Sequence, residues 1–220
     1  FEHSTLDKQY AYWYALGDGR GFTLGWIGFT TSSGSAAEVV RRYKQTRELA
    51  PIVRYLPELD RLKQGFQGDV SGLSGLPEAW AQATADPQFQ QAQDAVARDW
   101  YYAPAQRYAA QLGTTTPLAL ALLYDTAIQH GDGHDADGLS AILARAGRTP
   151  ARGADEADWL HRFVAARRAT LMNPANAATR STWRESVWRV EVWQQILDDE
   201  RYNLGSGVRV SGAWFDFQLP

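Results

Sequence analysis

The chain has 220 residues, of which 45% are hydrophobic and 21% charged, and its formal net charge is −3. This composition is typical of a globular protein with a substantial core, and it argues against a nucleic-acid-binding protein, which would carry a basic face. The absence of cysteine excludes disulfides and thiolate metal sites. No apolar run approaches the roughly 20 residues that span a bilayer, so we expect no membrane partner.

The first hundred residues alternate helical and glycine-rich segments. Residues 6–16 carry apolar side chains at helical spacing and end at Gly17, a favourable helix C-cap. Residues 22–31 have strand-like composition and predict a short hairpin. The pattern predicts helices over 36–46, 52–62 and 78–85, and a glycine-rich loop over 65–77 as a candidate boundary between lobes.

The rest of the chain is mainly helical in pattern. Helices are predicted over 87–110, 118–130, 139–146, 156–171 and 183–200, followed by a terminal strand or extended cover in the last twenty residues. We therefore predict a mainly α (α+β) fold with one small hairpin. Residues 1–220 would form a single catalytic domain of two lobes around a cleft, the smaller lobe covering about 18–62.

The segment Gly17-Asp18-Gly19-Arg20-Gly21-Phe22-Thr23 is the most distinctive of the chain. Glycines let the backbone turn sharply and let a ligand approach closely, and an adjacent arginine favours an ionised Asp18. Glu2, in an apolar setting, is a contrasting carboxyl that can keep its proton, and Thr23 can fix a water molecule. Such a carboxyl pair is what glycoside hydrolysis uses, although the residues alone favour a surface glutamate and a turn aspartate.

Asp125 stands inside the apolar stretch 118–128. A buried carboxylate requires a cationic or hydrogen-bonding partner, and arginine can donate two parallel hydrogen bonds to it. The candidates are Arg167, Arg168 and Arg180. The network would orient a lobe, tune a catalytic acid, or do both.

Two other features favour structural interpretations. Most of the nine tryptophans are expected in an aromatic core, although flat rings also cover the C–H faces of sugars. The run from His130 to Gly138 holds three aspartates and two histidines, but its spacing does not match a calcium loop. We interpret it as a solvated connection and predict no metal and no cofactor.

A series of short motifs follows in order along most of the chain, over about residues 2–180. They are Glu2-His3-Ser4-Thr5, Gly17 to Thr23, Ile27-Gly28-Phe29, Tyr55-Leu56-Pro57, Trp80, residues 89–93, Tyr124-Asp125 with His130-Gly131, residues 148–156, Ala166-Arg167 and Thr179-Arg180. Together these motifs resemble the bacterial chitosanases of glycoside hydrolase family 46, whereas the last forty residues match weakly.

The resemblance implies a lysozyme-like, two-lobed helical fold and endo-acting hydrolysis with inversion of configuration. Carried over by position, Glu2 would be the general acid, Asp18 the general base and Thr23 a residue that positions the attacking water. The resemblance also implies an interior charge network linked to the acid, made of Asp125, Arg167 and Arg180.

The chain departs from this family at Tyr14, Ala15 and Ser35, where the family carries acids. Fewer carboxylates weaken the attraction for a cationic polymer, while aromatic rings near the expected cleft favour a neutral or N-acylated sugar. The residues expected to contact substrate are Arg20, Tyr14, Trp13, Trp26 and Ser35.

These observations predict a secreted, monomeric, inverting endo-glycosidase that acts on a β-linked hexosamine polymer. The abrupt start at Phe1 leads us to expect that an upstream segment has been removed or left out. Two alternatives stay open at this point. One is the same catalytic pair acting on a neutral or N-acylated glycan, and the other is a non-catalytic carbohydrate-binding relative.

Overall fold

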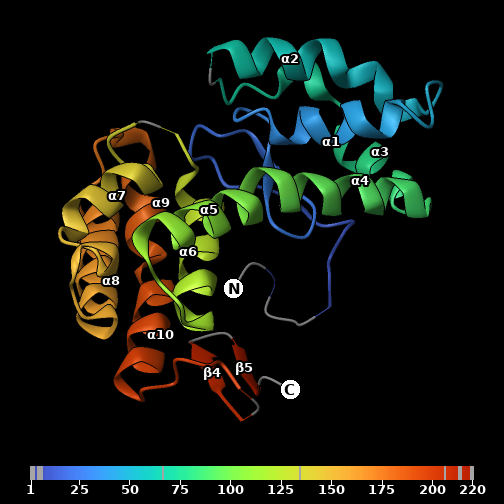
Figure 1. Ribbon diagram of the computed structural model, residues 1–220. Coiled ribbons are helices and arrows are strands. Elements are labelled where there is room, and N and C mark those ends of the chain that lie inside the picture. The colour runs from blue at the N-terminus through green and yellow to red at the C-terminus, as the bar shows by residue number, and fades with distance from the viewer. Residues whose placement is uncertain are drawn as a thin grey trace. The chain divides into compact units, whose positions relative to one another are not determined.

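The computed structural model describes residues 3, 7–65, 67–133, 135–205, 207–212 and 215–218 (Figure 1). The chain forms two compact units, and the division falls between Arg98 and Asp99. The glycine-rich loop at 65–77, predicted as a lobe boundary, thus lies inside the first unit. This unit extends past residue 62 because helix α4 (Pro87–Ala97) packs along helix α1 (Ser35–Lys44).

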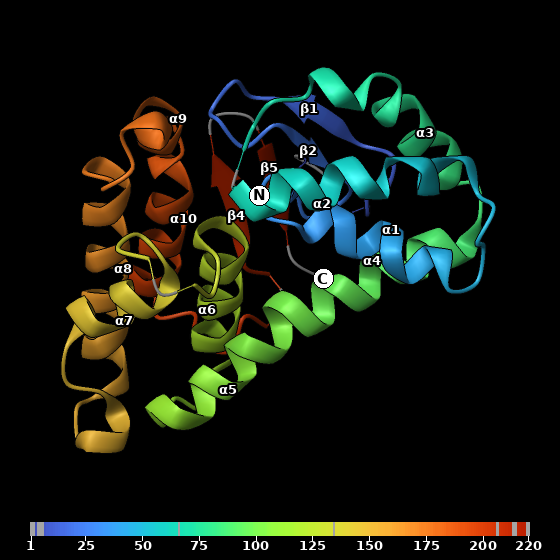
Figure 2. The same ribbon diagram turned by 90° about the horizontal axis from the view of Figure 1, so that it is seen from above.

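The first unit joins a small sheet to four helices. The strands β1 (Trp13–Ala15), β2 (Phe22–Leu24) and β3 (Phe29–Thr30) form an antiparallel sheet in chain order. The helices are α1 (Ser35–Lys44), α2 (Leu56–Gly65), α3 (Leu76–Ala83) and α4 (Pro87–Ala97), with short 3-10 turns at 51–55 and 71–73. Figure 2 shows α1 beside both α2 and α4, in agreement with their contacts.

The helix predicted over residues 6–16 is wrong where the structure describes it. Trp13–Ala15 is the edge strand β1, in which Trp13 pairs with Leu24 and Ala15 with Phe22. The apolar residues of a short segment fit helical and strand patterns equally well, and pairing with the neighbouring strand decides the outcome. The predicted hairpin is present as β2 and β3, with β1 as a third strand.

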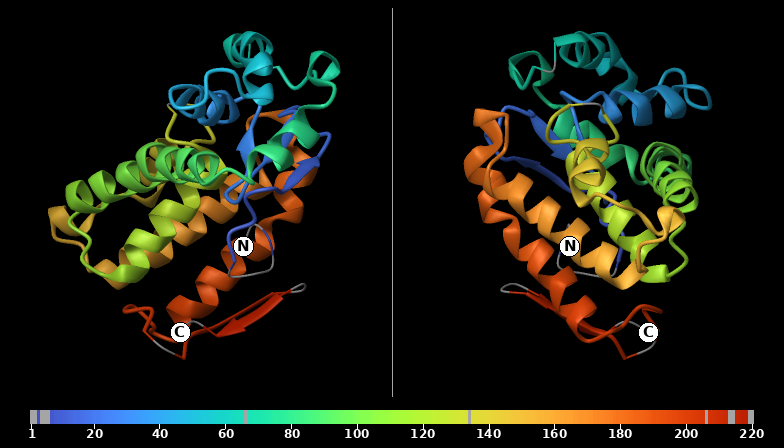
Figure 3. Two further views of the ribbon diagram at one scale, coloured as in Figure 1. Left: turned by 90° about the vertical axis from the view of Figure 1, so that its right-hand side faces the viewer. Right: turned by 60° about the vertical axis from the view of Figure 1, so that its left-hand side comes forward.

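The second unit is helical apart from one hairpin. Its helices are α5 (Ala103–Leu112), α6 (Pro117–His130), α7 (Leu139–Ala146), α8 (Glu156–Met172), α9 (Arg180–Glu185) and α10 (Val187–Asp198), and its strands are β4 (Arg209–Gly212) and β5 (Phe215–Gln218). Figure 3 shows the hairpin at the far end of α10, which β4 contacts. The predicted helix 87–110 is interrupted by a π-helical turn at Arg98–Tyr102, and the predicted helix 183–200 breaks at Ser186.

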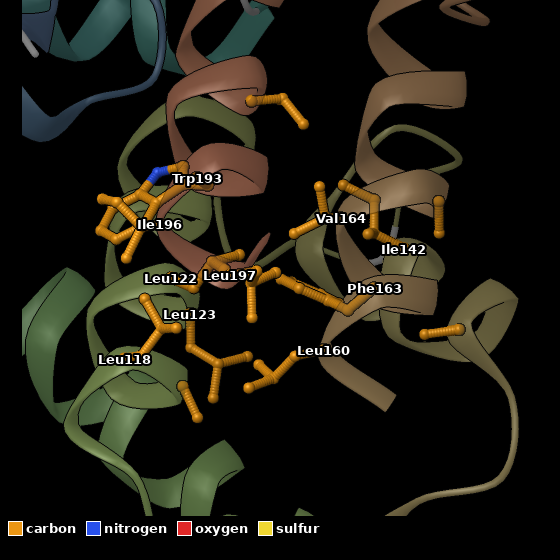
Figure 4. Close-up of a cluster of buried hydrophobic side chains, with 14 of the residues drawn as sticks. Leu118, Leu122, Leu123, Ile142, Leu160, Phe163, Val164, Trp193, Ile196 and Leu197 are labelled. Atoms are coloured by element: carbon orange, nitrogen blue, oxygen red, sulfur yellow. The ribbon is translucent and has the colours of Figure 1, made fainter. Parts of the chain in front are cut away.

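The second unit's core forms where α6, α7, α8 and α10 converge. Leu122, Phe163 and Leu197 are fully or almost fully buried and meet there with their labelled neighbours in Figure 4. Local signals set the helix ends: Thr116 caps α6 just before Pro117, and the Asp155 carboxylate accepts the Asp158 amide at the start of α8. The mainly helical fold class is confirmed. In the part of the chain that the structure describes, the helices lack the length and apolar character that crossing a membrane requires.

Truncating this core costs the most where burial is complete. We expect Leu122→Ala to lower the free energy of unfolding by about 2–5 kcal/mol, because it removes apolar contacts and leaves a cavity. Leu49→Ala is the matched control, since Leu49 is 95% exposed and should change stability by less than about 0.5 kcal/mol. Urea denaturation measures both. Equal losses in the two variants would contradict the placement of this core.

Candidate active site

The acidic loop between β1 and β2 holds Asp18 in a dry, doubly hydrogen-bonded position. One carboxylate oxygen accepts the backbone amide of Arg20 at 3.0 Å, and the other accepts its Nε at 2.8 Å. The Asp18 side chain is 1% exposed, whereas that of Arg20 is 31% exposed. Burying a carboxylate is costly unless it is paired, and the two hydrogen bonds from Arg20 offset that cost for Asp18.

The glycines of this loop are required by its geometry. At Gly21 the backbone has φ of 76°, and a Cβ would lie 2.2 Å from the hydroxyl of Thr31. A Cβ on Gly68 would lie 2.2 Å from the carbonyl oxygen of Gly19, so a second segment presses directly on the loop. Side chains at these positions would push the loop away from the fold and carry Asp18 with it.

Thr23 lies in the middle strand, opposite Tyr14 on one side and Thr30 on the other. Side chains that face each other across antiparallel strands share one face of the sheet. The sheet thus sets the Thr23 hydroxyl beside the Tyr14 ring, which is 52% exposed. Trp13 is also exposed and packs edge-on against Phe22, with ring centroids 6.2 Å apart.

Ser35 does not lie on an exposed surface. It is 1% exposed, and its hydroxyl accepts the amide of Thr30 at 3.0 Å and lies 2.9 Å from the hydroxyl of Ser33. It connects β3 to the start of α1, which is a structural role and does not favour the substrate contact expected from the sequence. Trp26 is half-buried in the turn between β2 and β3.

Glu2, the expected acid, lies outside the described residues. The segment that follows it is firmly attached: the carbonyl oxygen of Tyr10 accepts Nε1 of Trp80 at 2.9 Å and Nε2 of Gln93 at 3.1 Å. The amide of Gly25 then donates to the carbonyl oxygen of Tyr12. These bonds tie the approach to β1 to the helices α3 and α4.

The second unit buries a carboxylate at Asp125 on α6. One oxygen accepts Nη1 of Arg167 at 2.6 Å and Nε1 of Trp193 at 2.8 Å, and the other accepts Nε of Arg189 at 2.8 Å. Burial alone would raise the pKa of Asp125, but the charges of Arg189 and then Arg167 outweigh it and hold the pKa well below its ordinary value. The carboxylate joins α6, α8 and α10.

The prediction that Arg180 pairs with Asp125 is wrong. Arg180 is exposed as the first residue of α9, and Arg189 on α10 supplies the second guanidinium instead. The signal that could have identified it is an arginine flanked by apolar residues on a buried face, the same argument that singled out Asp125. Arg167, which is 0% exposed, is placed as predicted.

The segment between α6 and α7, which holds three aspartates, forms hydrogen bonds between its described side chains and nearby backbone groups. Asp137 accepts the amides of Ala175 and Asn176, and its own carbonyl oxygen lies 2.9 Å from Nδ1 of His130. Among the residues that the structure describes, which exclude His134, no group of three or more potential ligands could hold a metal ion. Within its described residues, this segment connects α6 to α7 by ordinary hydrogen bonds.

A cavity of about 380 Å³ lies elsewhere in the first unit, between α1, the 51–55 turn and α3. Its wall includes Tyr43, Ile52 and Asp86, but none of the residues expected at the site. Asp86 caps α4 and accepts the Tyr43 hydroxyl, so its carboxylate is engaged in holding the fold. None of the site residues that the sequence predicts therefore lines this cavity.

The mainly helical fold and the acidic loop beside a small sheet agree with the glycoside hydrolase expected from the sequence. The family model for glycosyl hydrolase family 46 matches residues 1–207, and the chain belongs to that family. The predicted resemblance is thereby confirmed.

Individual relatives agree with this assignment. The chain is 44% identical to the chitosanase of Bacillus subtilis over 96% of its own length and 77% of the relative's. It matches a Gynuella sunshinyii family 46 chitosanase in complex with chitotetraose with a TM-score of 0.97 and 41% identity, over 99% of this chain and 92% of that one. A mutant chitosanase from Bacillus subtilis MY002 complexed with six glucosamine units matches with a TM-score of 0.96 and 42% identity, again over 99% and 92%.

The Asp125 network distinguishes the two arginines experimentally. We expect Arg189→Met to lower the free energy of unfolding by about 3–5 kcal/mol, because it leaves part of a buried charge without its partner. Arg180→Met, the matched control, should change it by less than about 0.5 kcal/mol. Chemical denaturation at neutral pH gives both values. A larger loss in the Arg180 variant would restore the original assignment.

His130 should make stability depend on pH above the range in which carboxyl groups titrate. Burial, and then the charge of Arg167, hold the pKa of His130 well below its ordinary value of 6.5. The unfolded chain therefore takes up a proton below about pH 6.5 that the folded protein does not, and stability falls as pH falls. Between about pH 7.5 and 5.5 the wild type should lose about 1 kcal/mol more than His130→Asn.

Subtracting the two stability curves removes the contribution of all groups that the proteins share. The curves should run parallel above about pH 7.5, where His130 is neutral in both the folded and the unfolded chain. Parallel curves down to about pH 5 would show that burial of this ring does not affect proton uptake.

Proposed function

We propose that the protein is an endo-acting, inverting chitosanase in which Glu2 is the general acid and Asp18 the general base. The observation that carries the proposal is the buried Asp18 carboxylate, held by two donors of Arg20 in a loop where Gly21 has no room for a side chain. A base that is already oriented and desolvated needs little reorganisation during the reaction. The family membership gives this geometry its chemical meaning.

In the proposed reaction, Glu2 gives its proton to the glycosidic oxygen as the bond to the anomeric carbon breaks. Asp18 takes a proton from a water molecule that attacks this carbon from the opposite face, so the configuration inverts. An ionised carboxylate has about four acceptor positions, and Arg20 occupies two, so capacity remains for this water. Thr23, on the same small sheet, positions the water through its hydroxyl.

Chitosan is the proposed substrate because related structures bind chitotetraose and six glucosamine units. The exposed rings of Trp13 and Tyr14 offer flat surfaces for the C–H faces of the sugars. A long cationic polysaccharide does not pass through a membrane, so we further propose that the enzyme acts outside the cell, as a monomer. The two alternatives raised by the sequence, a neutral or N-acylated glycan and a non-catalytic relative, are not favoured by these comparisons.

The catalytic assignment is tested by removing one carboxyl at a time. Glu2→Gln and Asp18→Asn should each lower kcat on chitosan by at least about 100-fold, because each removes a proton-transfer group while keeping its shape. Reducing-end release measures the rate, and early appearance of short oligomers checks endo-cleavage. Proton NMR of fresh product should show the α-anomer first.

Asp60→Asn serves as the control, since Asp60 is a half-exposed acid on α2 that pairs with Arg41. This variant should keep wild-type kcat, and thermal unfolding of all the variants checks that they fold. Retained activity in Glu2→Gln would remove that residue from the mechanism. Early β-anomer would exclude inversion, and activity on acetylated but not deacetylated polymer would exclude chitosan.

A further inference from the structure

Lys8, Asp94, Tyr10 and Trp26 form a cluster of charged and aromatic side chains within the first unit. The ammonium group of Lys8 donates to the Asp94 carboxylate at 2.9 Å, and the Tyr10 hydroxyl lies 3.1 and 3.0 Å from its two oxygens. The same ammonium nitrogen lies 4.5 Å from the ring centre of Trp26 and 5.8 Å from that of Tyr10. A carboxylate and two aromatic rings thus surround one primary ammonium.

The chemistry of this cluster suits an amine in particular. An ammonium group over an aromatic face is attracted by the ring quadrupole, and a carboxylate supplies the opposite charge. Burial would lower the pKa of Lys8, but the hydrogen bond and charge of Asp94 more than offset this and raise the pKa above its ordinary value. The cluster therefore stabilises a protonated amine.

The site is open to solvent. The side chain of Lys8 is 45% exposed and that of Asp94 is 40% exposed. An ion pair of this exposure is weak, and a long lysine side chain can leave it at little cost. An external ammonium group can therefore reach Asp94 once Lys8 moves aside.

We propose that Asp94, Tyr10 and Trp26 form an accessory binding site for a protonated glucosamine unit, and that Lys8 occupies this site in the free protein. The Lys8 ammonium stands where the amino group of the sugar binds, and the Trp26 ring contacts the sugar as well as the charge. A second anchoring point holds a polymer near the enzyme between cleavage events. The identity of the polymer rests on the proposed function, whereas the preference for an ammonium group rests on this cluster alone.

The test uses binding, with hydrolysis prevented by Asp18→Asn. Chitotetraose is titrated into the ¹⁵N-labelled full chain, and the indole N–H signal of Trp26 is followed after assignment by comparison with Trp26→Phe. Adding Lys8→Ala should tighten the apparent Kd at this signal at least threefold, because the internal competitor is gone. Adding Asp94→Asn to that variant should abolish the response.

Two controls make the result specific. Lys44→Ala removes an exposed lysine of α1 and should leave the Kd at Trp26 unchanged. The fully N-acetylated tetramer has no ammonium group and should not move the signal. Since Asp94 is partly exposed, Asp94→Asn should fold, and Trp26→Leu measured by calorimetry provides a second route to the same loss.

Three results would overturn the proposal. The first is a Trp26 signal that does not respond to chitotetraose, or an apparent Kd at this signal that tightens less than threefold in Lys8→Ala. The others are an equal response to the acetylated tetramer and an unchanged response in Asp94→Asn. Any of these would leave the Lys8–Asp94 pair as a simple tether between the N-terminal segment and α4. Chitosan hydrolysis by the wild type is measured separately, so failure of this site and failure of the proposed function remain distinguishable.

Discussion

The carboxylate of Asp125 imposes the strictest physical constraint on the second unit. A charge inside an apolar helix would unfold its surroundings unless donors from other helices reach it, and Arg167 on α8, Arg189 and Trp193 on α10 do so. This requirement fixes the rotation of three helices about one point, whereas apolar packing alone tolerates many arrangements. The buried apolar side chains of the same helices pack around this network, so the carboxylate and the core together hold α6, α8 and α10.

The first unit also buries a carboxylate, but its hydrogen-bond donors come from a residue nearby in the chain. Asp18 obtains its donors from Arg20, two residues along the chain, and the positive φ angles of Gly19 and Gly21 allow the backbone to turn back on itself. A long-range network and a tight loop thus solve one electrostatic problem in two ways. The loop solution places the buried carboxylate of Asp18 beside the small sheet that carries Thr23, whereas the network solution encloses Asp125 among three helices.

Sequence reasoning succeeded where the signal was local and failed where a distant partner decided. Residues 118–130 and 139–146 carry their own apolar pattern and end signals, and both helices are as predicted. Trp13–Ala15 became a strand because β2 lies beside it, which no short-range pattern encodes. In the same way, sequence identified the need for an arginine at Asp125, but only the packing of α10 shows that Arg189 meets it.

The position of Ser35 bears on how a chain with few acids near its sheet can bind a cationic polymer. An acid there would be buried beside Ser33 and would have to displace the hydroxyl that accepts the Thr30 amide. A carboxylate at a half-exposed position such as Asp94 carries a smaller desolvation cost and can exchange partners. In the accessory site proposed here, attraction for an ammonium group comes from a surface carboxylate next to an aromatic ring and not from an acid built into the fold.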